Sequence, residues 1–333
     1  MRFLARVVPT FFAVSGLVQA LAIAPRDNHD FFSGFLDTLY EHGLTTLADS
    51  YKKISRTNEG KQIIKQLESG EFTVLAPENK AFGSYHTTIE PDVIRYSTLF
   101  GKFDNGCDTG SHSRRAATFQ SRSTSPSTFR RSSAPSRKRA EPFEDYQVQI
   151  VDRYYDSSTN EHSVVIDRPV GNAKIGDKFC YKNLVILTTD TILTTPPLVS
   201  ELLSQPLTES APNGFSKFLD ALQRTQLADT MDNKDRLTSF VPLDESLNGW
   251  DEYSNEELKL MVENHIFFGQ VLFSNRFTSA GEVTAQSGER LKLSVEDGTS
   301  YVSCGTSKVK MLRTDVTSSN GVVHVTDGPI QCN

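Results

Sequence analysis

The two halves of the chain repeat each other, and this internal repeat constrains the fold more than any other feature. Four segments of the first half align, in the same order, with four of the second: residues 35–39 with 218–222, 47–49 with 227–229, 72–82 with 237–247, and 183–190 with 320–327. Self-similarity at a long period is the signature of repeated structural units. A chain of 333 residues also has room for two domains of ordinary size. We therefore expect two tandem domains of one fold.

Within each half, patterns typical of helices come before patterns typical of strands. Apolar residues at helical spacing over residues 32–39 predict a first helix. In the second half, Ser254 followed by Glu257 predicts a capping box at a helix start. Later in each half, residues 146–150 and 291–295 alternate apolar and polar side chains, which is typical of half-buried strands. Helices followed by strands indicate α+β domains.

Residues 104–142 interrupt the pattern of the first half. This stretch holds nine serines, three prolines and eight Lys or Arg residues. A stretch of this composition buries too little apolar surface to offset the conformational entropy that it would lose on ordering. We therefore expect a disordered insert within the first domain. The stretch 198–212 is expected to be a linker, which places the two domains at residues 30–197 and 213–330.

The first 22 residues predict a secretory signal peptide. Arg2 and Arg6 precede an apolar run, and Ala20 and Ala22 supply the small residues that a signal peptidase reads. The apolar run is too short and too interrupted to span a bilayer comfortably, and no later run is long enough to do so. We expect a secreted protein without membrane insertion, located outside the cell or at the cell surface or cell wall.

The four cysteines fit an oxidising compartment. They are Cys107, Cys180, Cys304 and Cys332, and they permit three connectivities. We favour Cys107–Cys180 and Cys304–Cys332 because each pair stays within one expected domain. No Cys-x-x-Cys pair occurs, so the sequence predicts no metal site.

Two of the repeated segments carry a family resemblance. Residues 73–82, Thr-Val-Leu-Ala-Pro-Glu-Asn-Lys-Ala-Phe, resemble the first signature of the fasciclin (FAS1) family, and residues 314–327 are similar to the second. The family's Tyr-His pair is split here, with the tyrosine at Tyr96 and the histidine at His265. The resemblance implies two tandem fasciclin-like domains, each an antiparallel β wedge with a helical layer. It also implies adhesion through protein or glycan contact, without a cofactor.

The resemblance also suggests candidate binding residues. Glu90, Pro91 and Asp92 resemble a motif used for receptor contact in animal fasciclin relatives, and Tyr96 and His265 derive from the family's Tyr-His pair. Each has a structural alternative. A proline with acidic neighbours is also ordinary helix initiation. A histidine on an apolar helix face, such as His265, is more often a core residue with satisfied hydrogen bonds, and we expect the same of His324.

The formal net charge of −6 is unevenly spread, because residues 109–140 hold eight Lys or Arg and no acidic residue. This basic arm can be a solvated loop without a role, a site for an acidic polysaccharide or other polyanion, or a site of proteolysis. The residues proposed for the last two roles are Arg130, Arg131, Arg137, Lys138 and Arg139. The acidic remainder of a secreted chain argues against a nucleic-acid partner.

The leading functional hypothesis is a non-enzymatic protein that contacts a matrix protein, a cell-surface protein or a polysaccharide through two weak surfaces, whose linkage raises avidity. The alternative is a soluble binding protein for a carbohydrate, a polyphenol or a lipid, with an apolar pocket. A hydrolase needs a convergent catalytic cluster, and residues 108–111 offer a single Asp-Thr-Gly-Ser where aspartic proteases need two aspartates. We therefore expect neither catalysis nor a cofactor.

Overall fold

The computed structural model describes residues 30–83, 89–103, 123–130, 146–156 and 161–332. The expected signal peptide lies outside these ranges, as do five of the residues singled out above: Cys107, Arg131, Arg137, Lys138 and Arg139. Arg130 is described as the last residue of a strand, without its side-chain surroundings. Within the described ranges, no helix is both long enough and apolar enough to cross a bilayer.

The chain forms two halves in which helices precede strands. The N-terminal half contains α1 (Phe31–Glu41), α2 (Thr45–Ile54), α3 (Asn58–Ser69), β1 (Phe72–Pro77), the 3-10 helix η1 (Asn79–Phe82), α4 (Pro91–Tyr96), β2 (Thr98–Phe100), β3 (Ser123–Arg130), β4 (Tyr146–Asp156), β5 (Glu161–Asp167), β6 (Ala173–Tyr181) and β7 (Leu184–Thr189). The C-terminal half contains α5 (Val199–Leu202), α6 (Ser216–Arg224), α7 (Ala228–Asn233), β8 (Leu237–Pro242), η2 (Asp244–Ser246), η3 (Trp250–Glu252), α8 (Asn255–Glu263), β9 (Ile266–Phe268), η4 (Ser274–Arg276), α9 (Phe277–Ala280), β10 (Glu282–Thr284), β11 (Arg290–Glu296), β12 (Thr299–Cys304), β13 (Ser307–Thr317) and β14 (Gly321–Thr326). This order confirms the expected α+β class.

The predicted local signals are present. The first predicted helix is α1, and Ser254 and Glu257 form both hydrogen bonds of a capping box at the start of α8. The two alternating segments lie in β4 and β11. Asn79 and Asp244 each accept a hydrogen bond from a backbone N–H in the first turn of a helix, Thr46 in α2 and Lys217 in α6. These residues therefore cap helices from the segment that follows a strand.

Both sheets are mainly antiparallel, and each contains one parallel pair at the equivalent place. Strands β1 to β7 close into a barrel in sequence order, whereas the C-terminal sheet has the order β10-β11-β12-β13-β14-β8-β9. In the parallel pair β1·β7, Phe72 lies opposite Leu184, and in β8·β14, Leu237 lies opposite Gly321. The sequence repeat aligns Phe72 with Leu237 and Leu184 with Gly321, so the aligned segments occupy the same register.

Aligned asparagines make the same contacts in both halves. Asn183 donates from its side-chain amide to the carbonyls of Leu67 and Gly70 at the end of α3. Asn320 donates to the carbonyls of Met231 and Lys234, at 2.6 and 2.7 Å, at the end of α7. In both halves the amide satisfies carbonyls that a helix end leaves without a partner.

Aligned threonines and aspartates repeat as well. The hydroxyls of Thr73 and Thr238 each donate to the backbone of the segment after the next strand, at 2.9 and 3.0 Å. The carboxylates of Asp190 and Asp327 each accept a backbone N–H, from Lys174 at 2.8 Å and from Lys310 at 3.0 Å. The two halves therefore share their internal polar contacts as well as their strand order.

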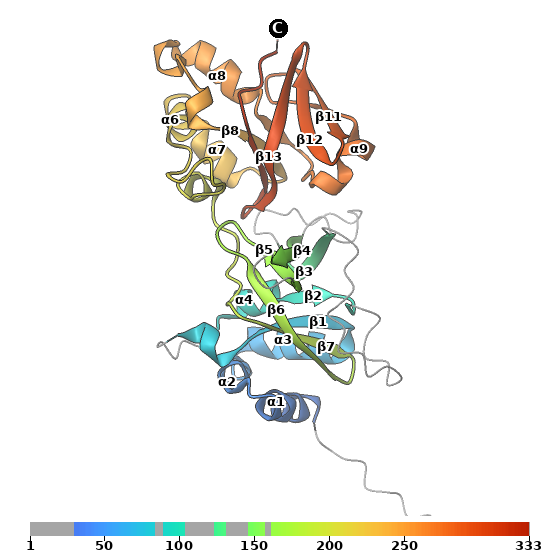
Figure 1. Cartoon of the computed structure of the whole chain (residues 1–333). Coiled ribbons are helices and arrows are strands. Elements are labelled where there is room, and N and C mark those ends of the chain that lie inside the picture. The colour runs from blue at the N-terminus through green and yellow to red at the C-terminus, as the bar shows by residue number, and fades with distance from the viewer. Residues whose placement is uncertain (1–29, 84–88, 104–122, 131–145, 157–160, 333) are drawn as a thin grey trace, which may run out of the picture.

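Each half buries its own apolar core between helices and sheet. Phe35, Leu39 and Tyr51 pack in a cluster that also includes side chains of β1 and β7. Phe218 and Leu222 occupy the corresponding cluster of the C-terminal half. The two halves are stacked, with α1 and α2 at the end away from the C-terminal half and β4 and β5 toward it (Figure 1).

Two expectations about connecting segments are corrected. Residues 123–130 of the expected disordered insert form β3, which pairs with β4 and β2. Backbone pairing does not require apolar side chains, and Ser127 is buried with its hydroxyl bonded to the carbonyl of Gln147 at 3.0 Å. Residues 198–212 are not an exposed linker, because Val199, Leu202 and Leu207 are buried in the C-terminal core.

We predict that Asn320→Ala lowers the free energy of unfolding by about 2–3 kcal/mol, because it removes the amide donor from the buried carbonyl of Met231 and the part-buried carbonyl of Lys234. The matched control is Asn233→Ala. Asn233 is exposed and donates only within its own helix, to Asp229, so a change below about 0.5 kcal/mol is expected. Urea unfolding of both variants measures the difference. Equal midpoints for the two variants would show that the asparagine contact does not stabilise the C-terminal half.

Candidate binding site between the two halves

The guanidinium of Arg313 holds the two halves together. From β13 its Nη2 atom donates to Asp167 Oδ1 at 2.8 Å, and its Nη1 atom donates to the carbonyl of Pro169 at 2.7 Å. It also donates to the carbonyls of Arg168 and Leu207. The planar fork of arginine can satisfy several acceptors at once, which a lysine cannot do. We call these contacts the Arg313 clamp.

A second set of contacts lies along β4. The amide of Gln147, which is 1% exposed, donates to the carbonyls of Ser318 and Ser319 at 3.0 and 2.7 Å. Val148 and Ile150 pack in one cluster with Phe273 and Val322 of the C-terminal half. Over residues 147–151 both faces of β4 are therefore buried, although the alternating pattern predicted a half-buried strand.

Tyr96 lies at the same junction. It is 5% exposed at the end of α4, and its side chain hydrogen-bonds to Thr317 of the C-terminal half. Burial raises the pKa of the Tyr96 phenol to about 12, and the bond to Thr317 opposes that rise. The hydroxyl therefore stays protonated at physiological pH and serves as a fixed polar group.

A cavity of about 330 Å³ opens beside Tyr96, between the two halves. It lies at the lower end of the volume range of small-molecule sites, which is roughly 300–1,000 Å³. We call it the junction cavity. Its walls come from α4, from the turn after β5, from the segment around α5 and from the end of β13: Tyr96, Arg168, Pro169, Val170, Leu193, Thr194, Thr195, Pro196, Pro197, Glu201, Leu202, Gln205 and Thr317.

The candidate residues Glu90, Pro91 and Asp92 form the start of the helix that carries Tyr96. Glu90 is the N-cap residue, Pro91 is in the first turn, and Asp92 lies 3.3 Å from Arg95 one turn later. These positions agree with helix initiation. The side chains of Glu90 and Asp92 are exposed, so a contact role for them stays a prediction.

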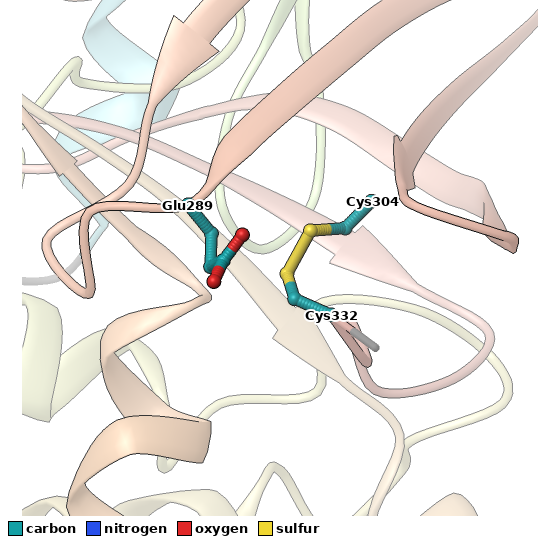
Figure 2. Close-up of side chains that lie close together, drawn as sticks. All are labelled: Glu289, Cys304 and Cys332. Carbon is teal, nitrogen blue, oxygen red and sulfur yellow. A yellow bond between two sulfur atoms is a disulfide. The ribbon is translucent and has the colours of Figure 1, made fainter.

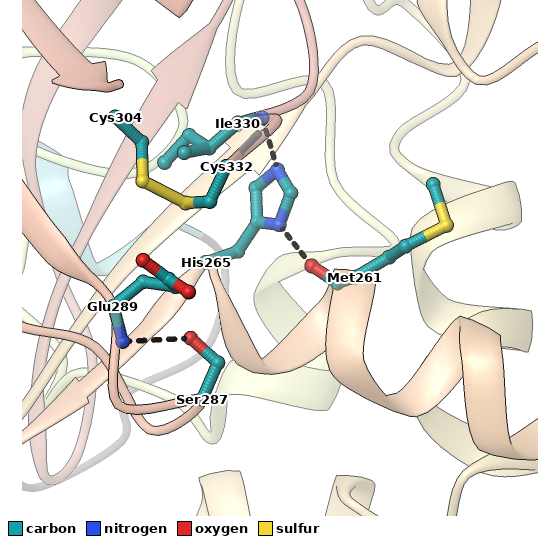
Figure 3. Close-up of a disulfide and its surroundings, with 7 residues drawn as sticks. All are labelled: Met261, His265, Ser287, Glu289, Cys304, Ile330 and Cys332. Carbon is teal, nitrogen blue, oxygen red and sulfur yellow. Dashed lines mark hydrogen bonds between the residues drawn. A yellow bond between two sulfur atoms is a disulfide. The ribbon is translucent and has the colours of Figure 1, made fainter.

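His265 is in the core of the C-terminal half, apart from these residues. Its Nε2 atom accepts the N–H of Ile330 and its Nδ1 atom bonds to the carbonyl of Met261, both at 2.8 Å (Figure 3). Burial lowers the pKa of His265 to about 4, so the ring is neutral at physiological pH. Phe218 and Trp250 face the ring edge to face. The prediction of a core histidine with satisfied hydrogen bonds is confirmed.

The same prediction is confirmed for His324. Its Nδ1 atom accepts the N–H of Asp315 at 3.1 Å, and its Nε2 atom lies 2.9 Å from the carbonyl of Leu272. With one acceptor and one donor used, the neutral ring is fully satisfied.

The structure also explains the split Tyr-His pair. The carbonyl of Ser97 accepts the N–H of Leu75 at 2.8 Å, and the carbonyl of His265 accepts the N–H of Phe240 at 2.9 Å. Ser97 and His265 therefore hold equivalent positions in the two halves. The tyrosine that precedes Ser97 faces the junction, so the two residues of the split pair serve different parts of the molecule.

A disulfide joins Cys304 and Cys332, as predicted, and ties the C-terminal segment to β12. The Glu289 carboxylate lies within 4.8 Å of both sulfurs (Figure 2). Metal ions bind cysteine as the thiolate, and sulfurs bonded to each other provide none, so this group does not form a metal site. The Cys107–Cys180 pair stays a prediction, because Cys107 lies outside the described residues.

Comparison with known families identifies a fasciclin domain in residues 213–331. This confirms the resemblance for the C-terminal half, including the signature at residues 314–327. The match begins after α5 and ends one residue before Cys332, so it contains the core around His265.

Two curated relatives are fasciclin-like arabinogalactan proteins of fungi. One, from Phaeosphaeria nodorum, is 28% identical over 118 residues, which are 34% of this chain and 36% of the relative. The other, from Cercospora beticola, is 25% identical over 155 residues, which are 45% of this chain and 38% of the relative. The chain thus spans less than two fifths of the length of either relative.

Among solved structures, a FAS1 domain pair from the insect cell adhesion molecule Fasciclin I is similar to this chain. The alignment covers 87% of this chain and 98% of that one, with 15% identity and a TM-score of 0.37.

We predict that Arg313→Ala loosens the junction, because it removes the ion pair with Asp167, whose side chain is 13% exposed, and the bonds to the carbonyls of Arg168 and Pro169. Breaking such a pair costs about 2–4 kcal/mol. Small-angle scattering should show a larger radius of gyration, and Arg313→Lys should behave in the same direction. The control is Arg290→Ala, at an exposed position on β11. A scattering profile for Arg313→Ala that matches the control would contradict the role of the clamp.

We also predict that stability falls between pH 6.5 and pH 4 through His265. Because its pKa falls from its ordinary value of 6.5 to about 4 on folding, the unfolded state binds more protons in this window. Stability is full above pH 6.5, and acidification to pH 4 removes up to about 3 kcal/mol. Urea unfolding across this range measures the slope. His265→Gln should lower the free energy of unfolding at pH 7. It should also reduce the dependence of that free energy on pH by the equivalent of about one bound proton, and an unchanged dependence would contradict the assignment to His265.

Proposed function

We propose that this chain is a secreted, non-enzymatic protein that contacts cell-wall or matrix material through two fasciclin-like domains. The fasciclin domain at residues 213–331 is the observation that carries the proposal. The hydrogen bonds that recur at aligned asparagines, threonines and aspartates support the N-terminal half as a second, diverged domain of the same kind. The names of the two fungal relatives are consistent with a wall-associated role.

We further propose that the two domains act as one unit. The Arg313 clamp and the amide of Gln147 both cross the junction, and apolar side chains are buried between the halves. Binding surfaces on the two domains then keep a fixed spacing, so a second contact costs little additional ordering. This differs from two modules joined by a loose linker, in which avidity depends on linker length.

A second candidate function is that of a soluble binding protein for a small ligand. The junction cavity favours it, because a hollow of about 330 Å³ with mixed polar and apolar walls is large enough for a small molecule. A ligand in this position would contact both halves. The two functions differ in the partner, which is an insoluble polymer in the first and a free molecule in the second.

We predict that the purified full chain co-sediments with an insoluble cell-wall fraction. Retention at about 0.5 M salt would assign the binding to the folded domains, because screening at that ionic strength suppresses attraction by the positive charges of residues 109–140. Arg313→Ala should be retained more weakly than Arg290→Ala, since it loses the fixed spacing of the two surfaces. A chain that stays in the supernatant at low and high salt would refute the proposed wall contact.

A further inference from the structure

We infer that the junction cavity is one end of a groove that binds a neutral polysaccharide chain. A second hollow of about 470 Å³ lies next to it and shares Arg168, Pro169 and Val170 with it. The second hollow continues toward Leu312 and Arg313 on β13. The two hollows together cross the boundary between the halves, as an elongated ligand would require. This inference rests on the proposed contact with cell-wall or matrix polymers and assigns that contact a site.

The junction cavity presents polar side chains that no neighbour satisfies. Arg168, Glu201 and Gln205 line it, and within the part of the chain that the structure describes their side chains make no hydrogen bond or ion pair. The guanidinium offers donors, the carboxylate offers acceptors, and the amide offers both. Sugar hydroxyls donate and accept at once, so neighbouring hydroxyls on one ring match such a set of planar groups.

Apolar surface lies beside these polar groups. Val170 and Leu312 are 45% and 37% exposed at the edges of the groove. Pyranose rings carry C–H faces that gain free energy when they cover such surface. The exposed side chains of Val170 and Leu312 thus provide apolar surface against which the sugar rings would pack.

The charges of the groove favour a neutral ligand. Three arginines and four carboxylates line the two hollows: Arg153, Arg168, Arg313, Asp152, Asp167, Glu201 and Glu209. Because the two signs nearly balance, a polyanion would meet carboxylates along the whole groove and gain no net attraction. A lipid tail would leave the unpaired polar side chains without partners, at a cost in free energy. A neutral chain of hydroxyl-bearing rings avoids both penalties.

The test is affinity electrophoresis of the full chain through gels that contain laminarin, galactomannan or arabinogalactan. The variant carries Glu201→Gln and Gln205→Ala, two exposed positions whose replacement leaves the cores intact. The matched control is Gln223→Ala, an exposed glutamine on α6 outside the groove. The wild type and the control should be retarded by at least one polysaccharide. The double variant should bind it about tenfold more weakly, since it loses hydrogen bonds that include a charged acceptor.

Retardation of the double variant equal to that of the control would overturn the inference. So would unretarded migration of the wild type in all three gels. The outcome is separate from that of the proposed function. If the chain co-sediments with the wall fraction but binds none of the three soluble polysaccharides, the proposed wall contact is supported and the proposed groove is refuted. If the chain binds in neither assay, both the wall contact and the groove are refuted.

Discussion

The arrangement of the two halves depends on the guanidinium of Arg313, which lies between acceptors from two segments, one in each half. In the N-terminal half, Asp167 ends β5, and the carbonyls of Arg168 and Pro169 belong to the turn that follows. In the C-terminal half, the carbonyl of Leu207 belongs to the segment after α5. The acceptors at residues 167–169 would lose this donor if the halves separated. Since one side chain satisfies all of them, the junction, the cavity beside it and the course of residues 198–212 are fixed together.

The repeated unit could be predicted from sequence because its polar contacts are local to each half. Asn183 and Asn320 align, and each satisfies the end of a helix in its own half. The capping box at Ser254 and the core position of His265 also follow from neighbours close in sequence. Such signals are readable because each of these residues satisfies backbone groups that its own segment leaves without partners.

The junction could not be predicted in the same way. Gln147 and Gln149 alternate with apolar residues and so indicate a strand with one face in solvent, yet the amide of Gln147 finds its acceptors in the turn between β13 and β14. The prolines near residue 200 indicate a linker between the domains. The burial of Val199 and Leu202 instead depends on their contacts with the C-terminal core, which are distant in sequence. The cavity combines Tyr96, Arg168, Gln205 and Thr317, which are far apart in the chain. No short-range sequence pattern predicts that residues so far apart in the chain lie close together in space.

Five apolar residues buried between positions 199 and 211 set where the packed core of the second domain begins. The fasciclin match starts at residue 213, but Val199, Leu203, Leu207 and Ala211 fill the core behind it. A fragment cut at the start of the match would expose an apolar hole on its helical side. The smallest piece with a complete core starts upstream of Val199, at the prolines that also line the cavity. The domain border drawn by homology and the border drawn by packing therefore differ by about one helical turn and a loop.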